Sequence, residues 1–177
     1  MRALHKTYMV VGPWAPLLHE PAQNFAMMVW GLPGQGKSTL LIKLSRYLAK
    51  TFGPVLYVSN EEFGSKSLQS KLSSAGGSVP GLDFGKNIPD DASLRAYKFL
   101  IIDSVATLKI TLEQFRALTL RHPNLARIIV MQSTKSGQFK GNNEWPHEVD
   151  IEVEAHGPGR ATVTKNRFGK LRTMQIF

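Results

Sequence analysis

The sequence predicts an α/β protein with a mostly parallel central sheet flanked by helices. Short apolar runs typical of buried strands alternate with segments whose apolar residues recur at helical spacing, an order that favours parallel strands covered by helices. Near the end of the chain, apolar segments on either side of Gly157-Pro158-Gly159 predict a C-terminal β-hairpin extension. The 177 residues, 42% of them apolar, suffice for one domain with a buried core.

The first predicted strand covers Phe25–Trp30 and ends in glycines. The next segment, Ser38–Lys50, places three leucines on one helical face and its basic residues on the other, which predicts an amphipathic helix. A second buried strand is predicted at Val55–Ser59. Leu68 and Leu72 indicate a short helix after it, which two glycines end.

The segment Ser73–Asp91 is rich in Gly, Ser, Pro and Asp, and we expect a loop there. Phe99–Asp103 is the third predicted strand. Thr111 and Gln114 have the spacing of a capping box and predict the start of the next helix. A fourth strand is predicted at Arg127–Gln132.

Apolar residues in Val149–Ala155 alternate with acidic ones, which predicts a strand with one face in water. After the turn at 157–159, two further strands are expected at Ala161–Thr164 and Thr173–Phe177. The sequence therefore predicts that its last three strands follow one another closely.

Composition excludes several classes of site. The chain has no cysteine, which rules out disulfides, thiolate zinc sites and cysteine nucleophiles. No apolar run approaches the ~20 residues that span a bilayer, and the N-terminal stretch lacks the apolar region of a signal peptide. We expect a cytoplasmic protein without zinc or a membrane partner. Its 22 basic and 13 acidic residues give a net charge of +9, which suits a polyanionic partner.

Residues 31–39 (GLPGQGKST) match the pattern G-x-x-x-x-G-K-[ST] between a predicted strand and a helix. Glycines let successive backbone N–H groups point at one anion, and the helix N-terminus adds positive charge. Lys37 is expected to reach the β- and γ-phosphates and the Ser38 hydroxyl to bind Mg²⁺. We therefore expect ATP and Mg²⁺ as cofactors, with the nucleotide held by Gly31, Gly34, Gln35, Gly36, Lys37, Ser38 and Thr39.

Carboxylates follow two other predicted strands. Asp103 ends an apolar strand and is expected to hold the magnesium ion with Ser38. Glu61 and Glu62 follow the second strand, and the carboxyl ends of parallel strands gather where ligands bind. One of the two glutamates is a candidate for orienting the attacking water. The residues alone leave open that either only stabilises the start of the next helix.

Four stretches, in this order, resemble the ATPase core of the RecA superfamily: 31–39 (GLPGQGKST), 56–62 (LYVSNEE), 101–108 (IIDSVATL) and 165–169 (KNRFG). The last is similar to the motif that identifies the bacterial RadA (Sms) family, and DnaB-type helicases are the next most similar. The resemblance implies a RecA-like P-loop NTPase domain over residues 25–177, with 1–24 as an N-terminal segment or linker. RadA proteins also have a four-cysteine zinc finger and a Lon-protease-like domain, and this sequence contains neither.

Position by position, the resemblance implies catalytic roles for Lys37, Glu61, Gln132, Lys165 and Arg167. Glu61 corresponds to the catalytic carboxylate and Gln132 to the glutamine that senses the γ-phosphate, where RadA proteins commonly have histidine. Lys165 and Arg167 correspond to the pair that enters the active site of the neighbouring subunit. The resemblance thus implies a homo-oligomer, either a ring or a filament.

The residues themselves give a weaker argument for this pair. Lys165 and Arg167 are two positions apart, so in a strand their side chains would point the same way. A guanidinium group on a transferring phosphoryl group is worth ~10³–10⁵ in rate. Without the resemblance, a solvated basic edge is the simpler interpretation.

The polar stretch Ser133–Pro146 corresponds to the second DNA-binding loop of the superfamily. Lys135 and Lys140 could neutralise phosphates, and Phe139 and Trp145 could stack on bases at ~1–3 kcal/mol each. We expect single-stranded DNA as the partner. The residues leave open that Trp145 packs beneath its own loop or at a subunit interface, and that the two lysines are solvated.

Together these features predict an ATP hydrolase of the RecA/RadA type that binds DNA. In a ring or filament it would couple ATP hydrolysis to DNA recombination, repair or remodelling, in the cytoplasm and on the nucleoid if the source is bacterial. Two alternatives remain: a DNA-binding filament for which ATP is only a switch, and a KaiC-like regulatory ATPase that acts on protein partners.

Overall fold

A computed structural model describes residues 6–134, 136 and 143–177 of the chain. The strands are β1 Ala26–Gly31, β2 Val55–Val58, β3 Leu82–Gly85, β4 Phe99–Ile102, β5 Ala126–Gln132, β6 Ile151–Gly157, β7 Arg160–Asn166 and β8 Arg172–Gln175. The helices are η1 Gly12–Trp14, α1 Ala15–Leu18, α2 Lys37–Thr51, α3 Lys66–Ser74, α4 Asp91–Leu94, α5 Leu112–Arg121 and η2 Trp145–Glu148. In the described residues no helix combines the length and hydropathy needed to cross a bilayer.

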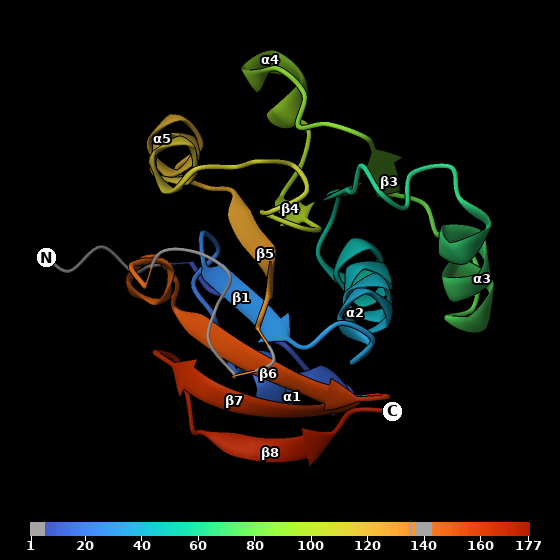
Figure 1. The fold of residues 1–177 in the computed structure, drawn as a ribbon. Coiled ribbons are helices and arrows are strands. Elements are labelled where there is room, and N and C mark those ends of the chain that lie inside the picture. Colours follow the sequence, from blue (N-terminus) through green and yellow to red (C-terminus); the bar gives the residue numbers. More distant parts are fainter. Residues whose placement is uncertain (1–5, 135, 137–142) are drawn as a thin grey trace, which may run out of the picture.

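The strands form one sheet in the order β3-β2-β4-β5-β1-β6-β7-β8 (Figure 1). All pairs from β3 to β6 are parallel, and β7 and β8 are antiparallel. This is the predicted α/β fold of the RecA-like type, with its C-terminal hairpin on a mostly parallel sheet. The parallel arrangement directs the carboxyl ends of β1, β2, β4 and β5 to one edge of the sheet.

Two apolar layers cover the faces of the sheet. In β4, Phe99 and Ile101 enter the layer that contains the leucines of α2, whereas Leu100 and Ile102 enter the layer under α5. The alternation follows from the pleat of a strand, which directs successive side chains to opposite faces. Both layers are needed because the central parallel strands are buried on both sides. Figure 1 shows α2 and α5 on opposite sides of the sheet.

Residues 6–24, part of the predicted N-terminal segment or linker, pack into the first of these layers. Tyr8, Trp14 and Leu17 are buried in the same core as α2. A bridge between Thr7 and Ala22 closes the segment into a loop around η1 and α1. The apolar residues of this segment therefore contribute to the core of their own chain.

One predicted loop is wrong in part. The structure continues α3 to Ser74 and places β3, Leu82–Gly85, in the segment expected to be a loop. β3 pairs in parallel with β2, with Leu82 opposite Val55. The strand has only four residues and lies at the edge of the sheet. Its sequence therefore shows no clear alternation of apolar and polar residues from which a strand could be predicted.

Candidate active site

A cavity of about 370 Å³ lies at the carboxyl ends of β1, β2, β4 and β5. It gathers residues from four segments that are distant in the sequence, as expected at the ligand-binding edge of a parallel sheet. The predicted site residues that line it are Gly34, Gly36, Lys37, Ser38, Thr39, Glu61, Asp103 and Gln132. Gly31 and Gln35, also predicted to bind the nucleotide, do not line the cavity.

The loop between β1 and α2 has the backbone that its glycines predict. Gly34 and Gly36 have φ angles of 78° and 75°, in the left-handed region, and Gly36 is the residue before α2. Gly31 lies against β6, where a Cβ atom would come within 2.7 Å of the Ala155 carbonyl oxygen. The loop thus curls ahead of the helix N-terminus, the geometry that favours an anion.

The Lys37 ammonium group is folded back onto this loop. Its Nζ donates hydrogen bonds to the carbonyl oxygens of Gly31 (2.9 Å) and Leu32 (2.8 Å). Burial lowers the pKa of Lys37, and the charge of Asp103 opposes this effect. Lys37 also lines the cavity.

Asp103 is buried just past the end of β4. Its Oδ2 atom accepts hydrogen bonds from the Ser38 hydroxyl (2.7 Å) and from the Tyr57 hydroxyl (2.5 Å). Burial raises the pKa of Asp103, while these two donors act in the opposite direction. A hydroxyl and a carboxylate at contact distance are hard oxygen donors of the kind that Mg²⁺ prefers, so the residues fit this ion.

The two glutamates after β2 differ in their contacts. Glu62 forms an ion pair with Lys71 of α3 and also accepts a hydrogen bond from Ser67 (3.5 Å). Glu61 is exposed and, among the described residues, makes no side-chain hydrogen bond or ion pair. Both line the cavity. Only Oε1 of Glu62 is engaged, and its Oε2 is buried without a hydrogen-bond partner, whereas the whole carboxylate of Glu61 is exposed and unpaired among the described residues.

Gln132 ends β5 and lies opposite Gly31 of β1 in the sheet register. It is half-buried at the cavity wall, and the next residue, Ser133, donates its N–H to the Gly31 carbonyl oxygen (3.1 Å). Gln132 therefore lies between the cavity and the segment that begins at residue 133.

Lys165 and Arg167 lie at the other end of the sheet. Arg167 forms an ion pair with Asp150 (3.0 Å), and the other carboxylate oxygen of Asp150 accepts the N–H of Ala26 at the start of β1 (2.9 Å). The cavity lies past the end of β1, roughly 16 Å away at about 3.3 Å per residue. The pair is therefore out of reach of the cavity in the same chain.

The argument from strand alternation covers only one member of this pair, although the two lie close enough that the charge of Arg167 adds to burial in lowering the pKa of Lys165. β7 ends at Asn166, so Arg167 lies outside the strand and the alternation rule does not apply to it. The Lys165 Nζ instead donates hydrogen bonds to the carbonyl oxygens of Pro146 and Val149 (2.7 Å each). Lys165 thus contacts the last residue of the predicted DNA-binding loop and a residue shortly after it.

Of the four residues predicted to contact DNA, the structure describes only Trp145. Lys135, Phe139 and Lys140 lie outside the described residues. Trp145 is buried at 4% exposure and packs on Phe115 of α5, with the ring centroids 5.4 Å apart. The interpretation of Trp145 as a base-stacking residue is wrong for this structure, because its faces are covered by its own core.

Two residues that contact the predicted carboxylates of the site were not found from the sequence. Tyr57 is a fully buried residue of β2 whose hydroxyl reaches Asp103, and burial together with the Asp103 charge raises its pKa well above the ordinary value. Lys71, on α3, neutralises Glu62. A single hydroxyl inside the otherwise apolar strand VLYV was the only signal for Tyr57, and Lys71 had none because its contact spans nine residues and a turn.

Comparison with known proteins finds similar sequences among bacterial DNA repair proteins. The chain is 31% identical over 175 residues to the DNA repair protein RadA of Campylobacter jejuni, an alignment that covers 85% of this chain and 39% of that protein. It is 33% identical over 179 residues to the DNA repair protein RadA of Streptococcus pneumoniae, covering 85% of this chain and 41% of that protein. The protein of the same name in Listeria monocytogenes is 32% identical over 179 residues.

The chain therefore spans about two fifths of the length of the curated relatives that it matches. No protein-family model matches it. The similarity covers 85% of this chain.

Proposed function

Because this chain has a RadA-like ATPase core, of the family of DNA repair and recombination ATPases, we propose that it binds ATP and hydrolyses it on single-stranded DNA. The observation that carries the proposal is the convergence of the loop at 34–39 with Glu61, Asp103 and Gln132 around one cavity. The proposed ATPase unit comprises residues 25–177 together with the N-terminal segment packed on their core.

In the proposed reaction Lys37 exchanges its two loop carbonyl partners for phosphate oxygens of ATP. Ser38 and Asp103 would hold Mg²⁺, which neutralises charge on the β- and γ-phosphates when bound. Ser38 already donates to Asp103, so its hydroxyl must turn its lone pairs toward the ion. These residues bind and position the triphosphate and leave the activation of water to another group.

Glu61 is the group proposed to orient the attacking water. Its carboxylate is unpaired among the described residues and lines the cavity, whereas Glu62 is occupied by Lys71. A carboxylate that positions a nucleophilic water contributes ~10²–10⁴ in rate. Gln132, at the end of the neighbouring β5, is proposed to contact the γ-phosphate and to transmit its presence to residues 133 onward.

Completion of the site is proposed to need a second copy of the chain. Lys165 and Arg167 lie at the amino end of β1, so they can serve only the cavity of another subunit. The exposed guanidinium of Arg167 would stabilise charge on the transferring phosphoryl group across the interface. Hydrolysis would then depend on assembly into a ring or filament.

The test is phosphate release measured against protein concentration, with and without single-stranded DNA. We expect activity per subunit to rise with protein concentration, to rise further with DNA and to vanish in Lys37→Ala. Lys50→Ala, an exposed lysine at the end of the same helix, is the matched control and should retain activity. Binding of ATP and DNA without phosphate release would refute the proposed ATP hydrolysis and would support the alternative in which ATP only switches DNA binding. Activity that is independent of protein concentration would overturn the assembly.

A further inference from the structure

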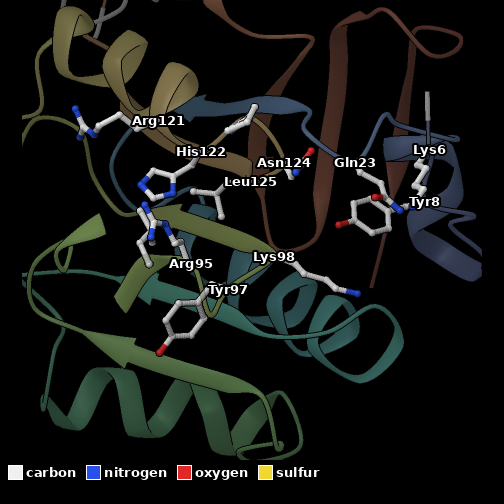
Figure 2. A pocket seen from close by; sticks show the side chains of 12 residues that line it. Lys6, Tyr8, Gln23, Arg95, Tyr97, Lys98, Arg121, His122, Asn124 and Leu125 are labelled. Atoms are coloured by element: carbon white, nitrogen blue, oxygen red, sulfur yellow. The ribbon is translucent and has the colours of Figure 1, made fainter. Parts of the chain in front are cut away.

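A second and larger cavity, of about 610 Å³, lies at the opposite edge of the sheet from the proposed ATP site. It is bounded by three segments: the N-terminal bridge, the turn between α4 and β4, and the turn between α5 and β5. Gln23, Lys98 and Leu125 each come shortly before the start of a parallel strand, which fixes the cavity at the amino ends. Figure 2 shows Lys6 and Gln23 on one side of it and Arg95 and His122 on the other.

The lining of this cavity is basic. It contains Lys6, Arg95, Lys98, Arg121 and His122, and no lining residue is acidic. An open cavity lined by one sign of charge focuses its field and attracts ions of the opposite sign. The ligand that this lining favours is therefore an anion.

Two of these groups contact a carboxylate and three do not. Asp91 of α4 accepts hydrogen bonds from Arg121 and His122 at one end of the cavity. Within residues 6–134, 136 and 143–177, no carboxylate lies at ion-pair distance from Lys6, Arg95 or Lys98.

Further hydrogen-bond donors are available in the lining. The Lys98 ammonium group donates one hydrogen bond, to the Phe52 carbonyl oxygen (2.7 Å), and has further N–H groups for a ligand. The amides of Gln23 and Asn124 also line the cavity and can donate to phosphate oxygens.

The form of the cavity favours a linear polyanion over a compact one. A compact phosphate is usually held by backbone N–H groups at a glycine-rich loop or a helix N-terminus. This cavity contains no glycine, and its helices contribute their C-terminal ends, at Leu94 and Arg121. Its cations without a carboxylate partner, Lys6, Arg95 and Lys98, are instead exposed long side chains on two separate segments, which suit successive phosphates of a strand.

We propose that this basic cleft binds the phosphodiester backbone of single-stranded nucleic acid. The inference rests on the proposed function, since it assumes that the protein binds DNA, and it adds a binding surface away from the ATP site. The chain's net charge of +9 agrees with this ligand. A strand held here would contact the amino edge of the sheet, so its affinity would not depend on the nucleotide pocket alone.

The experiment measures the affinity of the full chain for fluorescein-labelled oligo(dT) over a range of salt concentrations. In Lys6→Ala/Arg95→Ala, two exposed cations without a side-chain partner among the described residues are removed. Each contact with a single-strand phosphate contributes about 0.7 to the slope of log K against log salt, so the slope should fall in magnitude by about 1.4. Lys66→Ala/Lys86→Ala, exposed lysines after β2 and β3 at the other edge, is the matched control and should keep the slope.

The outcomes separate this inference from the proposed function. A wild-type protein that fails to bind oligo(dT) at low salt refutes the DNA-binding part of the proposed function. If the wild-type protein binds oligo(dT) and the cleft variant keeps the full slope of log K against log salt, or its slope falls no more than that of the control, the proposed role of the cleft is refuted. A third arm with polyglutamate tests an acidic protein partner: loss of polyglutamate binding in the cleft variant with an unchanged DNA slope would also overturn the proposal. Circular dichroism confirms that both variants are folded.

Discussion

Tyr57 donates its hydroxyl to the Oδ2 atom of Asp103 across 2.5 Å, from a position completely enclosed by the core. Ser38 donates to the same oxygen (2.7 Å). The carboxylate of Asp103 is thus held by one hydroxyl from β2 and one from α2. The structure fixes a buried charge at the cavity floor with two neutral donors and without a cation at ion-pair distance among the described residues.

We expect Asp103→Asn to raise the thermal midpoint of the magnesium-free protein at neutral pH. The pKa of Asp103 is raised from 3.8 by burial, so the folded state holds the proton more tightly than the unfolded chain. The ionised carboxylate therefore reduces stability as the pH rises above 3.8, and the amide removes this cost while its oxygen accepts both hydroxyls. The measurement is thermal unfolding of both proteins with a chelator present.

The gain should disappear at low pH, because below 3.8 both proteins are neutral at this position. Asp83→Asn, an exposed aspartate on β3, is the control and should change the midpoint little at either pH. A variant that is less stable than the wild type at neutral pH contradicts the argument.

Glu61→Gln and Glu62→Gln should have different effects. Loss of the unpaired Glu61 carboxylate should lower kcat by about 100-fold or more with ATP affinity retained. Glu62 is occupied by Lys71, so Glu62→Gln should lower kcat by less than about tenfold and act mainly on the ion pair with α3. Single-turnover hydrolysis and binding of a fluorescent ATP analogue separate the two. A larger loss of kcat in Glu62→Gln than in Glu61→Gln would instead assign the orientation of the attacking water to Glu62.

Arg167→Ala should bind ATP and fail to turn it over, with kcat reduced by ~10³ or more. Mixed with Lys37→Ala in equal amounts, it should recover activity, because a site then receives its lysine from one subunit and its arginine from the next. Random assembly would restore about a quarter of the wild-type sites. Arg160→Ala, at the far end of β7, is the control and should stay active alone. Two inactive proteins that stay inactive when mixed would refute the shared site.

Trp145→Leu should lower stability without weakening DNA binding. Replacement of the ring that packs on Phe115 by leucine leaves part of its volume empty, and since truncation of a buried aromatic side chain to alanine costs about 3–5 kcal/mol, we expect a smaller loss here. A tryptophan that stacked on a base would contribute ~1–3 kcal/mol to binding, at least about fivefold in affinity. Oligo(dT) affinity measured well below the thermal midpoint should therefore change by less than that. A fivefold loss at unchanged stability would restore the stacking role.

Most of the fold could be predicted because the central strands are buried on both faces. Runs such as residues 99–102 (FLII) and 127–131 (RIIVM) have no other common explanation than a core strand. The edge strand at Leu82–Gly85 and the short helices before Phe25 could not, because they lie where tertiary contacts outweigh local preference. Pro13 and Pro16, which look like interruptions, stand in the first turns of η1 and α1, where proline is tolerated.

The candidate site could be predicted where its residues lie at the carboxyl ends of strands in a parallel sheet. Asp103 and Gln132 needed only strand ends to be placed at one cavity. The partners that decide their chemistry, Tyr57 and Lys71, depend on contacts between elements, and no spacing along the chain encodes them. Trp145 was misplaced for the same reason, since a polar neighbourhood in sequence says nothing about the helix that covers it.

The close approach of Gly31 to Ala155 affects how mutations in the nucleotide loop should be understood. A methyl group at position 31 would collide with the backbone of β6 whether or not ATP is ever bound. Random libraries screened only for soluble expression should consequently already reject every other amino acid there, while accepting many at Gln35, which is half-buried and does not line the pocket. The first glycine of the motif is thus constrained by sheet assembly before it is constrained by phosphate.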